Sequence, residues 1–260
     1  MNVANHLHLV PEIEREIVDR KLDSLVIGLG PTGHLVPWIS RKVLNGLRLW
    51  GCHDVYRIMP VDDLFIFDAP KDRLHPGGEA FKLILEARPK RLWFFEGNYR
   101  TWEPHLHHPM RSVVRKVPMM VWQRGPRGNN MQRMPKRADL LADPVHTMWI
   151  SPTGMTTTAW KEGCRRIGVI GVDCRKFEHH SYQWVKADLD PFFTHCAEQA
   201  HELGGVICNL SPISALENFR KWTPSAPPPS ESSSAVTGTS TSTEQSSRSS
   251  IPSNDAPLGP

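Results

Sequence analysis

The sequence has no long apolar segment and no arrangement of cysteines that would hold a fold together. No window approaches the roughly 18 consecutive apolar residues of a membrane-spanning helix. The start, MNVANHLHLVPEIERE, has no apolar core of the kind that a secretory signal needs. The five cysteines are odd in number and include no CxxC pair, which argues against a disulfide framework and a zinc knuckle. These absences predict a soluble, cytoplasmic protein with reduced thiols and no membrane partner.

The C-terminal segment has no aromatic side chain. Residues 223–260 contain 17 Ser or Thr and 7 Pro, with one basic and three acidic residues. This composition cannot bury enough apolar area to offset its chain entropy, so we predict a disordered tail. Two roles remain open for this tail: a solubilising spacer, or a flexible tether to a protein partner.

The remaining residues, 1–222, predict a single folded domain. They carry 30 basic and 24 acidic residues, hence a net charge of +6 (30 − 24), which is mild for a protein dedicated to nucleic acid. A chain of this length buries about 70% of its unfolded surface, so it needs no disulfide or metal to fold.

Short apolar runs alternate with longer amphipathic stretches in this domain. Nearly continuous apolar runs suit parallel strands that are buried on both faces. We predict strands at residues 24–28, 64–67, 91–95, 119–122, 147–150, 167–170 and 206–210, and helices at 11–21, 79–88, 156–165 and 191–203. This alternation predicts an α/β domain, Rossmann-like and doubly wound around a mainly parallel sheet, which binds ligands outside the carboxyl ends of its strands.

Residues 28–33 (GLGPTG) follow the first predicted strand and match GxGxxG. Such a turn can bring main-chain N–H groups close to a phosphate. However, Pro31 removes one donor and Pro37 would interrupt the helix expected next. Asp54, near where a ribose-binding acid would sit, follows no predicted strand. A nicotinamide or flavin site is therefore disfavoured, and a phosphate-binding turn and a tight structural turn are the alternatives.

Acidic and hydroxyl side chains also follow predicted strands. Asp68 and Asp173 each end one, where a carboxylate can bind a ribose hydroxyl or Mg²⁺, or take a proton. For Asp68, a turn-forming role before Ala69-Pro70 is the alternative. A cluster of five hydroxyl residues also follows a predicted strand. Helix capping would use one or two of these hydroxyls, so the number of them favours a polar ligand. The cluster consists of Ser151, Thr153, Thr156, Thr157 and Thr158.

Two further groups of residues have open interpretations. The histidines at 105, 107, 108, 179 and 180 show neither HExxH spacing nor paired cysteines, which favours surface or substrate-contacting roles over a metal site. No GxSxG elbow and no P-loop is present. A basic stretch within residues 109–140 is either a solvated loop or a lid that meets phosphate or nucleic acid. Its cations are Arg111, Arg115, Lys116, Arg124, Arg127, Arg133, Lys136 and Arg137.

Three stretches resemble a known group of Rossmann-like proteins: Gly28-Leu29-Gly30-Pro31-Thr32, the aspartate that ends LFIFD (Asp68), and EGCRRIGVIGVD (residues 162–173). The group contains 6-hydroxymethylpterin pyrophosphokinase and the motility-associated glycosyltransferases that modify flagellin, with bacterial sialyltransferases as more distant relatives. The closing stretch, residues 201–219, is similar to the ends of short phage-encoded and bacterial members. The resemblance implies a nucleotide-type ligand held by the glycine turn, with Asp68, Ser151 and Asp173 around it.

The leading hypothesis is a nucleotide- or nucleotide-sugar-binding transferase that moves a glycosyl or phosphoryl group, with or without Mg²⁺. Asp68 and Asp173 would be the catalytic residues, and no residue is assigned as a metal ligand. The N–H groups of residues 30–33 and the hydroxyl cluster would hold the diphosphate, and arginines of the basic stretch would neutralise the leaving group. The predicted ligand-binding residues are Gly28, Gly30, Pro31, Thr32, Gly33, Ser151, Thr153, Thr156 and Gly171.

The rival hypothesis keeps the fold without the chemistry. It is a non-catalytic phage or accessory protein, in the host cytoplasm if phage-encoded, that binds or sequesters a nucleotide-like ligand or docks a partner through its tail. A third hypothesis, nucleic-acid binding through the basic stretch, is the weakest of the three.

Overall fold

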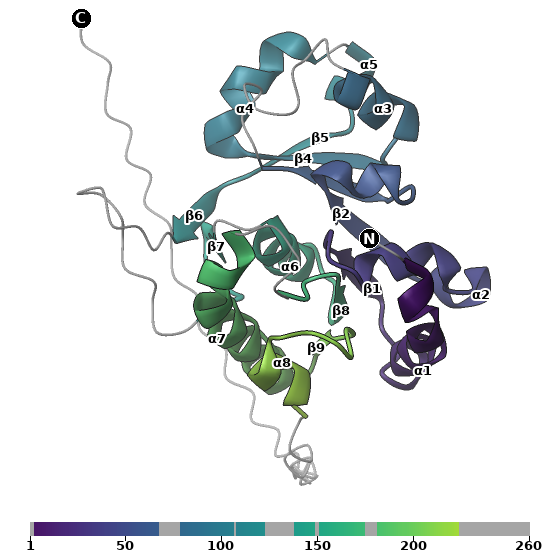
Figure 1. The fold of residues 1–260 in the computed structure, drawn as a ribbon. Helices are drawn as coiled ribbons and strands as arrows, with labels where there is room; N and C mark the ends of the chain where they lie inside the picture. The colour runs from purple at the N-terminus through teal and green to yellow at the C-terminus, as the bar shows by residue number, and fades with distance from the viewer. Residues whose placement is uncertain are drawn as a thin grey trace, which may run out of the picture. The chain divides into compact units, whose positions relative to one another are not determined.

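A seven-stranded parallel sheet with flanking helices forms the centre of the computed structural model (Figure 1). The structure describes residues 3–67, 79–106, 108–122, 138–148, 151–174 and 181–223, within the unit formed by residues 1–224. The strand order is β5-β4-β3-β2-β1-β8-β9, and every neighbouring pair is parallel. The predicted α/β class with a mainly parallel sheet is confirmed.

The strands are short and most are buried. In the large sheet they are β1 (Ser24–Ile27), β2 (Arg48–Cys52), β3 (Asp63–Ile66), β4 (Arg91–Phe95), β5 (Val114–Val117), β8 (Arg166–Ile170) and β9 (Val206–Asn209). A second, two-stranded parallel sheet pairs β6 (Met119–Trp122) with β7 (Val145–Met148). Pro118 alone separates β5 from β6, so one extended stretch leaves the edge of the large sheet and pairs in the small one.

Four longer helices overlap the predicted helices, although α6 begins five residues and α7 ten residues before the predicted starts. They are α1 (Val10–Asp19), α3 (Glu79–Ala87), α6 (Ser151–Lys161) and α7 (Ser181–Glu202). The shorter elements are α2 (Arg41–Leu44), α4 (Glu96–Trp102), α5 (His108–Arg111), α8 (Glu217–Lys221), η1 (Val3–Leu9), η2 (Gly33–Trp38), η3 (His53–Arg57) and η4 (Glu103–His105). Pro37 lies in the 3₁₀ helix η2, and no α-helix follows the glycine turn directly. Within the described residues, no helix combines the length and apolar character needed to cross a membrane.

The prediction missed β2 and β5. Gly51 and the charged Arg48 interrupt the apolar pattern of β2, although β2 lies inside the sheet between β1 and β3. A Cβ at position 51 would lie 2.7 Å from a methyl group of Val55, so glycine lets η3 pack against the strand. Asp54 therefore does follow a strand, contrary to expectation, and its carboxylate lies 3.4 Å from Arg57 Nε.

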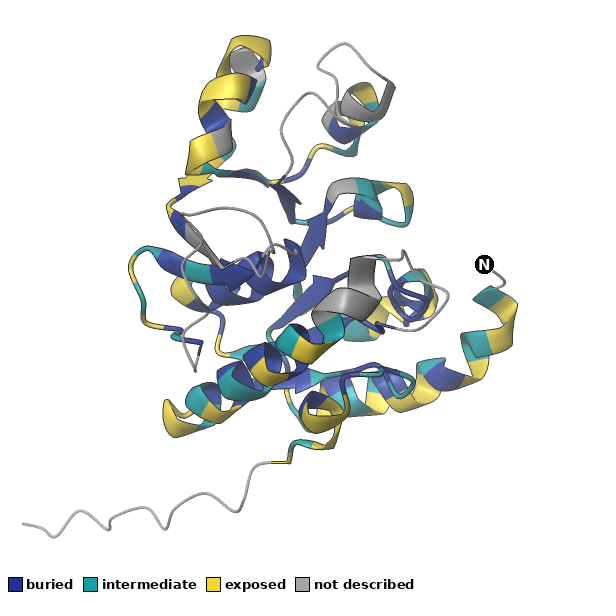
Figure 2. Ribbon diagram, turned by 60° about the vertical axis from the view of Figure 1, so that its left-hand side comes forward, coloured by how far each residue is buried: buried dark blue, intermediate teal, exposed yellow. Residues whose placement is uncertain are grey.

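Helix α6 is surrounded by protein along nearly its whole length. Its first ten residues are all buried (Figure 2). It packs against β1, β2, β3 and β8 of the large sheet and against β7 of the small one. The hydroxyl cluster of the sequence therefore lies on an interior helix, where each hydroxyl needs a partner.

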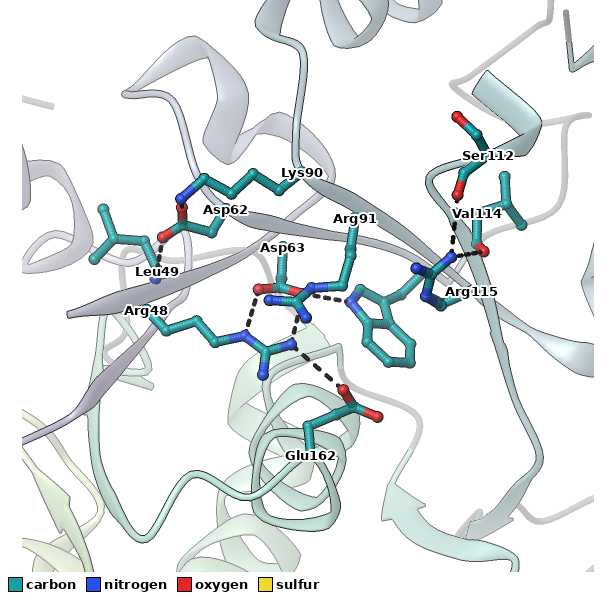
Figure 3. Close-up of polar contacts among 11 residues, drawn as sticks. Arg48, Leu49, Asp62, Asp63, Lys90, Arg91, Ser112, Val114, Arg115 and Glu162 are labelled. Carbon is teal, nitrogen blue, oxygen red and sulfur yellow. Dashed lines mark hydrogen bonds and ion pairs between the residues drawn. The ribbon is translucent and has the colours of Figure 1, made fainter. Parts of the chain in front are cut away.

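A charged cluster joins the amino ends of three strands (Figure 3). The Asp63 carboxylate is fully buried and accepts hydrogen bonds from Arg48 Nε at 2.7 Å, Arg48 Nη2 at 2.9 Å and Arg91 Nε at 2.8 Å. It also accepts one from Trp93 Nε1 at 2.7 Å. Glu162, which follows α6, lies 3.6 Å from Arg48 Nη2. Asp63 begins β3, and the two arginines begin β2 and β4. This cluster therefore holds the amino ends of the three strands together, at the edge of the sheet opposite to the predicted ligand site.

The edge strand β5 is protected by one of its own side chains. Leu92 of β4 donates its N–H to the Val113 carbonyl, so the neighbouring Val114 carbonyl points away from β4. Arg115 Nη1 donates to the carbonyls of Val114 at 2.8 Å and Ser112 at 3.2 Å (Figure 3). The guanidinium thus occupies acceptors that another strand would otherwise use.

Candidate functional site

The strand order reverses between β1 and β8. From β1 the chain proceeds through β2, β3, β4 and β5 on one side, and β8 and β9 lie on the other side. In open α/β sheets, ligands bind outside the carboxyl ends of the two strands at such a reversal. The two segments that follow these strands are the glycine turn, residues 28–33, and residues 171–174.

Three glycines bring these two segments into contact. A Cβ at Gly28 or Gly171 would overlap a carbonyl oxygen of the other, and a Cβ at Gly33 would overlap the Gly28 carbonyl oxygen. Gly171 also has a φ of +76°, which L side chains rarely adopt. The GxGxxG spacing therefore serves first to pack the ends of β1 and β8 against each other.

Most main-chain donors of the glycine turn are already used. Gly28 N–H donates to the Ile170 carbonyl and Gly30 N–H to the Gly171 carbonyl, both at 2.8 Å. Gly33 N–H donates to the Gly30 carbonyl at 2.9 Å. This differs from the expectation that residues 30–33 offer free donors to a diphosphate. Among the described residues, the half-buried Leu29 is the turn residue whose N–H has no hydrogen-bond partner.

Asp173 and Thr32 join the two segments directly. The carboxylate accepts from Thr32 N–H at 2.8 Å and from Thr32 Oγ1 at 2.8 and 3.0 Å, and both residues are fully buried. Thr32 Oγ1 in turn accepts from Gly171 N–H at 3.0 Å. Thr32 and Asp173 are 141 positions apart in the chain. The carboxylate therefore holds the glycine turn in place at the strand reversal.

A third segment, which follows β9, packs on the other side of Asp173. The Asp173 carbonyl accepts from Ala215 N–H at 2.8 Å, and Ser214 Oγ donates to the Val172 carbonyl at 3.2 Å. The next residue, Cys174, has a φ of +51°, an unusual value for a residue with a side chain. The carboxyl ends of β1, β8 and β9 thus form one hydrogen-bonded unit.

Three of the four threonines of α6 already have hydrogen-bond partners in the protein, whereas the Thr158 hydroxyl is buried without one. Thr153 Oγ1 accepts from Met148 N–H at 3.0 Å and lies 3.0 Å from Thr147 Oγ1. Thr156 Oγ1 donates to the Pro152 carbonyl and Thr157 Oγ1 to the Thr153 carbonyl, one turn back in the helix. Contact of these hydroxyls with a ligand stays a prediction, whereas their bonds within the protein account for much of the cluster.

The N-terminus of α6 lies at the same edge as the glycine turn. The helix ends near the amino edge, because Glu162 approaches Arg48 there and Arg165 N–H donates to Asp23, which precedes β1. Eleven residues span about 16 Å at 1.5 Å per residue, so Ser151 lies near the carboxyl edge. The start of a helix attracts anions through its free N–H groups.

Other predicted site residues are not tested by the structure. Asp68 lies outside the described residues, as do His107, His179, His180 and residues 123–137 of the basic stretch. The predicted tail from residue 224 onward also lies outside them. The pairing of Asp68 with Asp173 and a lid role for the arginines therefore stay predictions.

Two of the cysteines are buried deeply enough to stay protonated, and the described residues contain no cluster of metal-ligating side chains. Burial raises the pKa of the Cys208 thiol to about 12 and raises the pKa of Cys196 further, so both stay protonated at neutral pH. No group of three or more His, Cys, Asp or Glu side chains among the described residues is arranged to hold a metal ion. A role for Mg²⁺ therefore stays a prediction.

Comparisons with known proteins find one similar fold. No protein-family model matches the chain, and no curated protein matches it. A solved structure of the sialyltransferase CstII from Campylobacter jejuni, in complex with the substrate analogue CMP-3FNeuAc, is similar with a TM-score of 0.44 and 11% sequence identity. The match covers 78% of this chain and 86% of that one. The resemblance to the pyrophosphokinase gains no support from these comparisons.

Proposed function

We propose that this chain binds a nucleotide or nucleotide-sugar at the carboxyl edge of the sheet and transfers its glycosyl or phosphoryl group. The observation that carries the proposal is the reversal of strand order between β1 and β8, where a glycine turn is fastened by a buried carboxylate. This is the position at which open α/β sheets bind nucleotides. Asp173 is assigned a positioning role, because both of its oxygens accept hydrogen bonds from Thr32.

In this proposal, main-chain N–H groups from two parts of the chain bind a phosphate. One is the Leu29 N–H in the glycine turn. The other is the start of α6, where Ser151 is 9% exposed and the helix dipole favours an anion. Together they would hold a phosphate group without a metal ion. In addition, Asp68 would bind the ribose or a metal ion, and the arginines in residues 123–137 would neutralise the leaving group.

A ligand screen on the full chain tests the proposal. Tm would be measured with CMP, UDP, ADP, ATP, NAD, CMP-sialic acid and UDP-sugars, each with Mg²⁺ and with EDTA. A ligand at a hundred times its Kd adds about 2.7 kcal/mol of stability, so one class of base should raise Tm visibly. Release of free nucleotide from a bound nucleotide-sugar then separates a transferase from a protein that only sequesters the ligand. If no nucleotide raises Tm, the proposal is wrong.

The substitution Thr32→Val tests the fastening of the turn. Valine keeps the shape but removes the hydroxyl that bonds Asp173 and Gly171, leaving buried polar groups without a partner. We expect a loss of about 1–3 kcal/mol of unfolding free energy and weaker nucleotide binding. Thr32→Ser keeps the hydroxyl and should stay close to wild type in both. Urea denaturation and calorimetric titration measure the two effects, and equal behaviour of the two variants would contradict the assigned role.

A further inference from the structure

Two polar side-chain atoms at the end of β9 are buried without a hydrogen bond. Ser211 is 1% exposed, and its Oγ has no partner. Asn209 accepts the Ser211 N–H at 2.9 Å through Oδ1, but its Nδ2 is buried and unpartnered. Buried polar atoms nearly always have partners, so two unpartnered atoms on residues two positions apart need an explanation.

The neighbouring serine of the same turn shows that the turn can satisfy a hydroxyl. Ser214 Oγ donates to the Val172 carbonyl and accepts from Leu216 N–H, both at 3.2 Å. Both serines are almost fully buried, at 1% and 3% exposure. The difference between them therefore lies in available partners and not in burial.

The unpartnered atoms lie beside the strand reversal. Asn209 pairs with Val169 in the register of β9 and β8, and Leu210 N–H donates to the Val169 carbonyl. The turn that begins at Ser211 then bonds to residues 172 and 173, and Asp173 holds the glycine turn. Neighbouring strands are about 4.8 Å apart, so the pair is one strand away from the proposed nucleotide site.

We propose that Asn209 Nδ2 and Ser211 Oγ form a subsite for the sugar of a nucleotide-sugar, which rests on the proposed function. An amide donor and a hydroxyl, both neutral, match the hydroxyl and carbonyl oxygens of a sugar. Both atoms are covered in the ligand-free chain, so the turn of residues 211–214 moves aside when the sugar enters. The sugar then supplies the hydrogen bonds that the chain itself leaves unmade.

The test compares Ser211→Ala with Ser214→Ala as a matched control. Affinity would be measured by calorimetry for two pairs of probes, CMP with CMP-sialic acid and UDP with UDP-glucose. Ser211→Ala should weaken binding of the nucleotide-sugar by about tenfold and leave affinity for the nucleotide unchanged. Its Tm should equal or exceed that of wild type, because the removed hydroxyl has no partner.

Each outcome has a distinct meaning. Ser214→Ala should lower Tm, because its hydroxyl bonds the turn to Val172 and Leu216, and it should not reproduce a tenfold loss confined to the nucleotide-sugar. If Ser211→Ala binds the nucleotide-sugar as tightly as wild type, the subsite is overturned while the proposed nucleotide site stands. If wild type binds neither probe of either pair, the proposed function fails and the subsite fails with it.

Discussion

Replacing Asp63 by asparagine should lower the free energy of unfolding by about 3 kcal/mol, because two arginines would lose their buried counter-charge. The carboxylate is fully buried and accepts four hydrogen bonds, three of them from Arg48 and Arg91. Asparagine keeps the volume but presents an NH₂ group to donors. The estimate is at the lower end of the usual range for a broken buried pair, because the arginine side chains are 19% and 32% exposed and regain water. Urea denaturation followed by circular dichroism measures the change.

A surface ion pair provides the control for this prediction. Glu217 and Lys221 lie 3.6 Å apart, with side chains 59% and 68% exposed. Glu217→Gln should cost at most about 0.5 kcal/mol. Nucleotide binding by folded Asp63→Asn should match wild type, since the cluster lies at the opposite edge of the sheet. A change of less than 1 kcal/mol in Asp63→Asn would show that the cluster does not hold the strand starts together.

Replacing Gly33 by alanine should cost about 4 kcal/mol or more and abolish nucleotide binding. The added Cβ would overlap the Gly28 carbonyl oxygen, which also lies against Gly171. The turn cannot yield easily, because Gly28 N–H and Gly30 N–H are bonded to the end of β8. Tm and calorimetric titration with the nucleotide found in the screen measure the two effects.

Gly46→Ala is the matched control for this substitution. Gly46 is exposed, and an added Cβ would meet no atom within 4 Å. We expect a stability within about 0.5 kcal/mol of wild type and unchanged binding. A Gly33→Ala variant that folds and binds like Gly46→Ala would contradict the close packing of the two segments.

The fold was predictable where burial leaves a clear pattern. The apolar runs of β1, β4, β6, β8 and β9 identified their strands to within a residue or so of the observed ends. β5 was missed because an edge strand exposes Arg115 and Lys116, which erase the apolar signal. β2 was missed because its Arg48 pairs with a carboxylate that begins another strand. For β2 the decisive contact is tertiary, and local composition does not encode it.

The candidate site was predictable in its residues more than in their bonding. GxGxxG and the aspartate after β8 were found from spacing, and the structure brings Thr32 and Asp173 together. The number of N–H donors left for a ligand could not be predicted from the sequence. Thr32 N–H donates to Asp173 and Gly30 N–H donates to Gly171, and in each pair the acceptor lies 141 residues further along the chain. Leu29 was missed because its contribution is a main-chain N–H. Asn209 and Ser211 were missed because a lack of partners has no sequence pattern.

The guanidinium that covers the outer carbonyls of β5 affects how the protein behaves among its own copies. A parallel sheet has two edges, and an open edge invites another chain to add a strand. Arg115 places a positive charge and its own N–H group over two of the acceptors that such a strand would need. Growth of the sheet from this edge would have to displace that side chain and bring like charges together. This arginine thus favours solubility at high concentration.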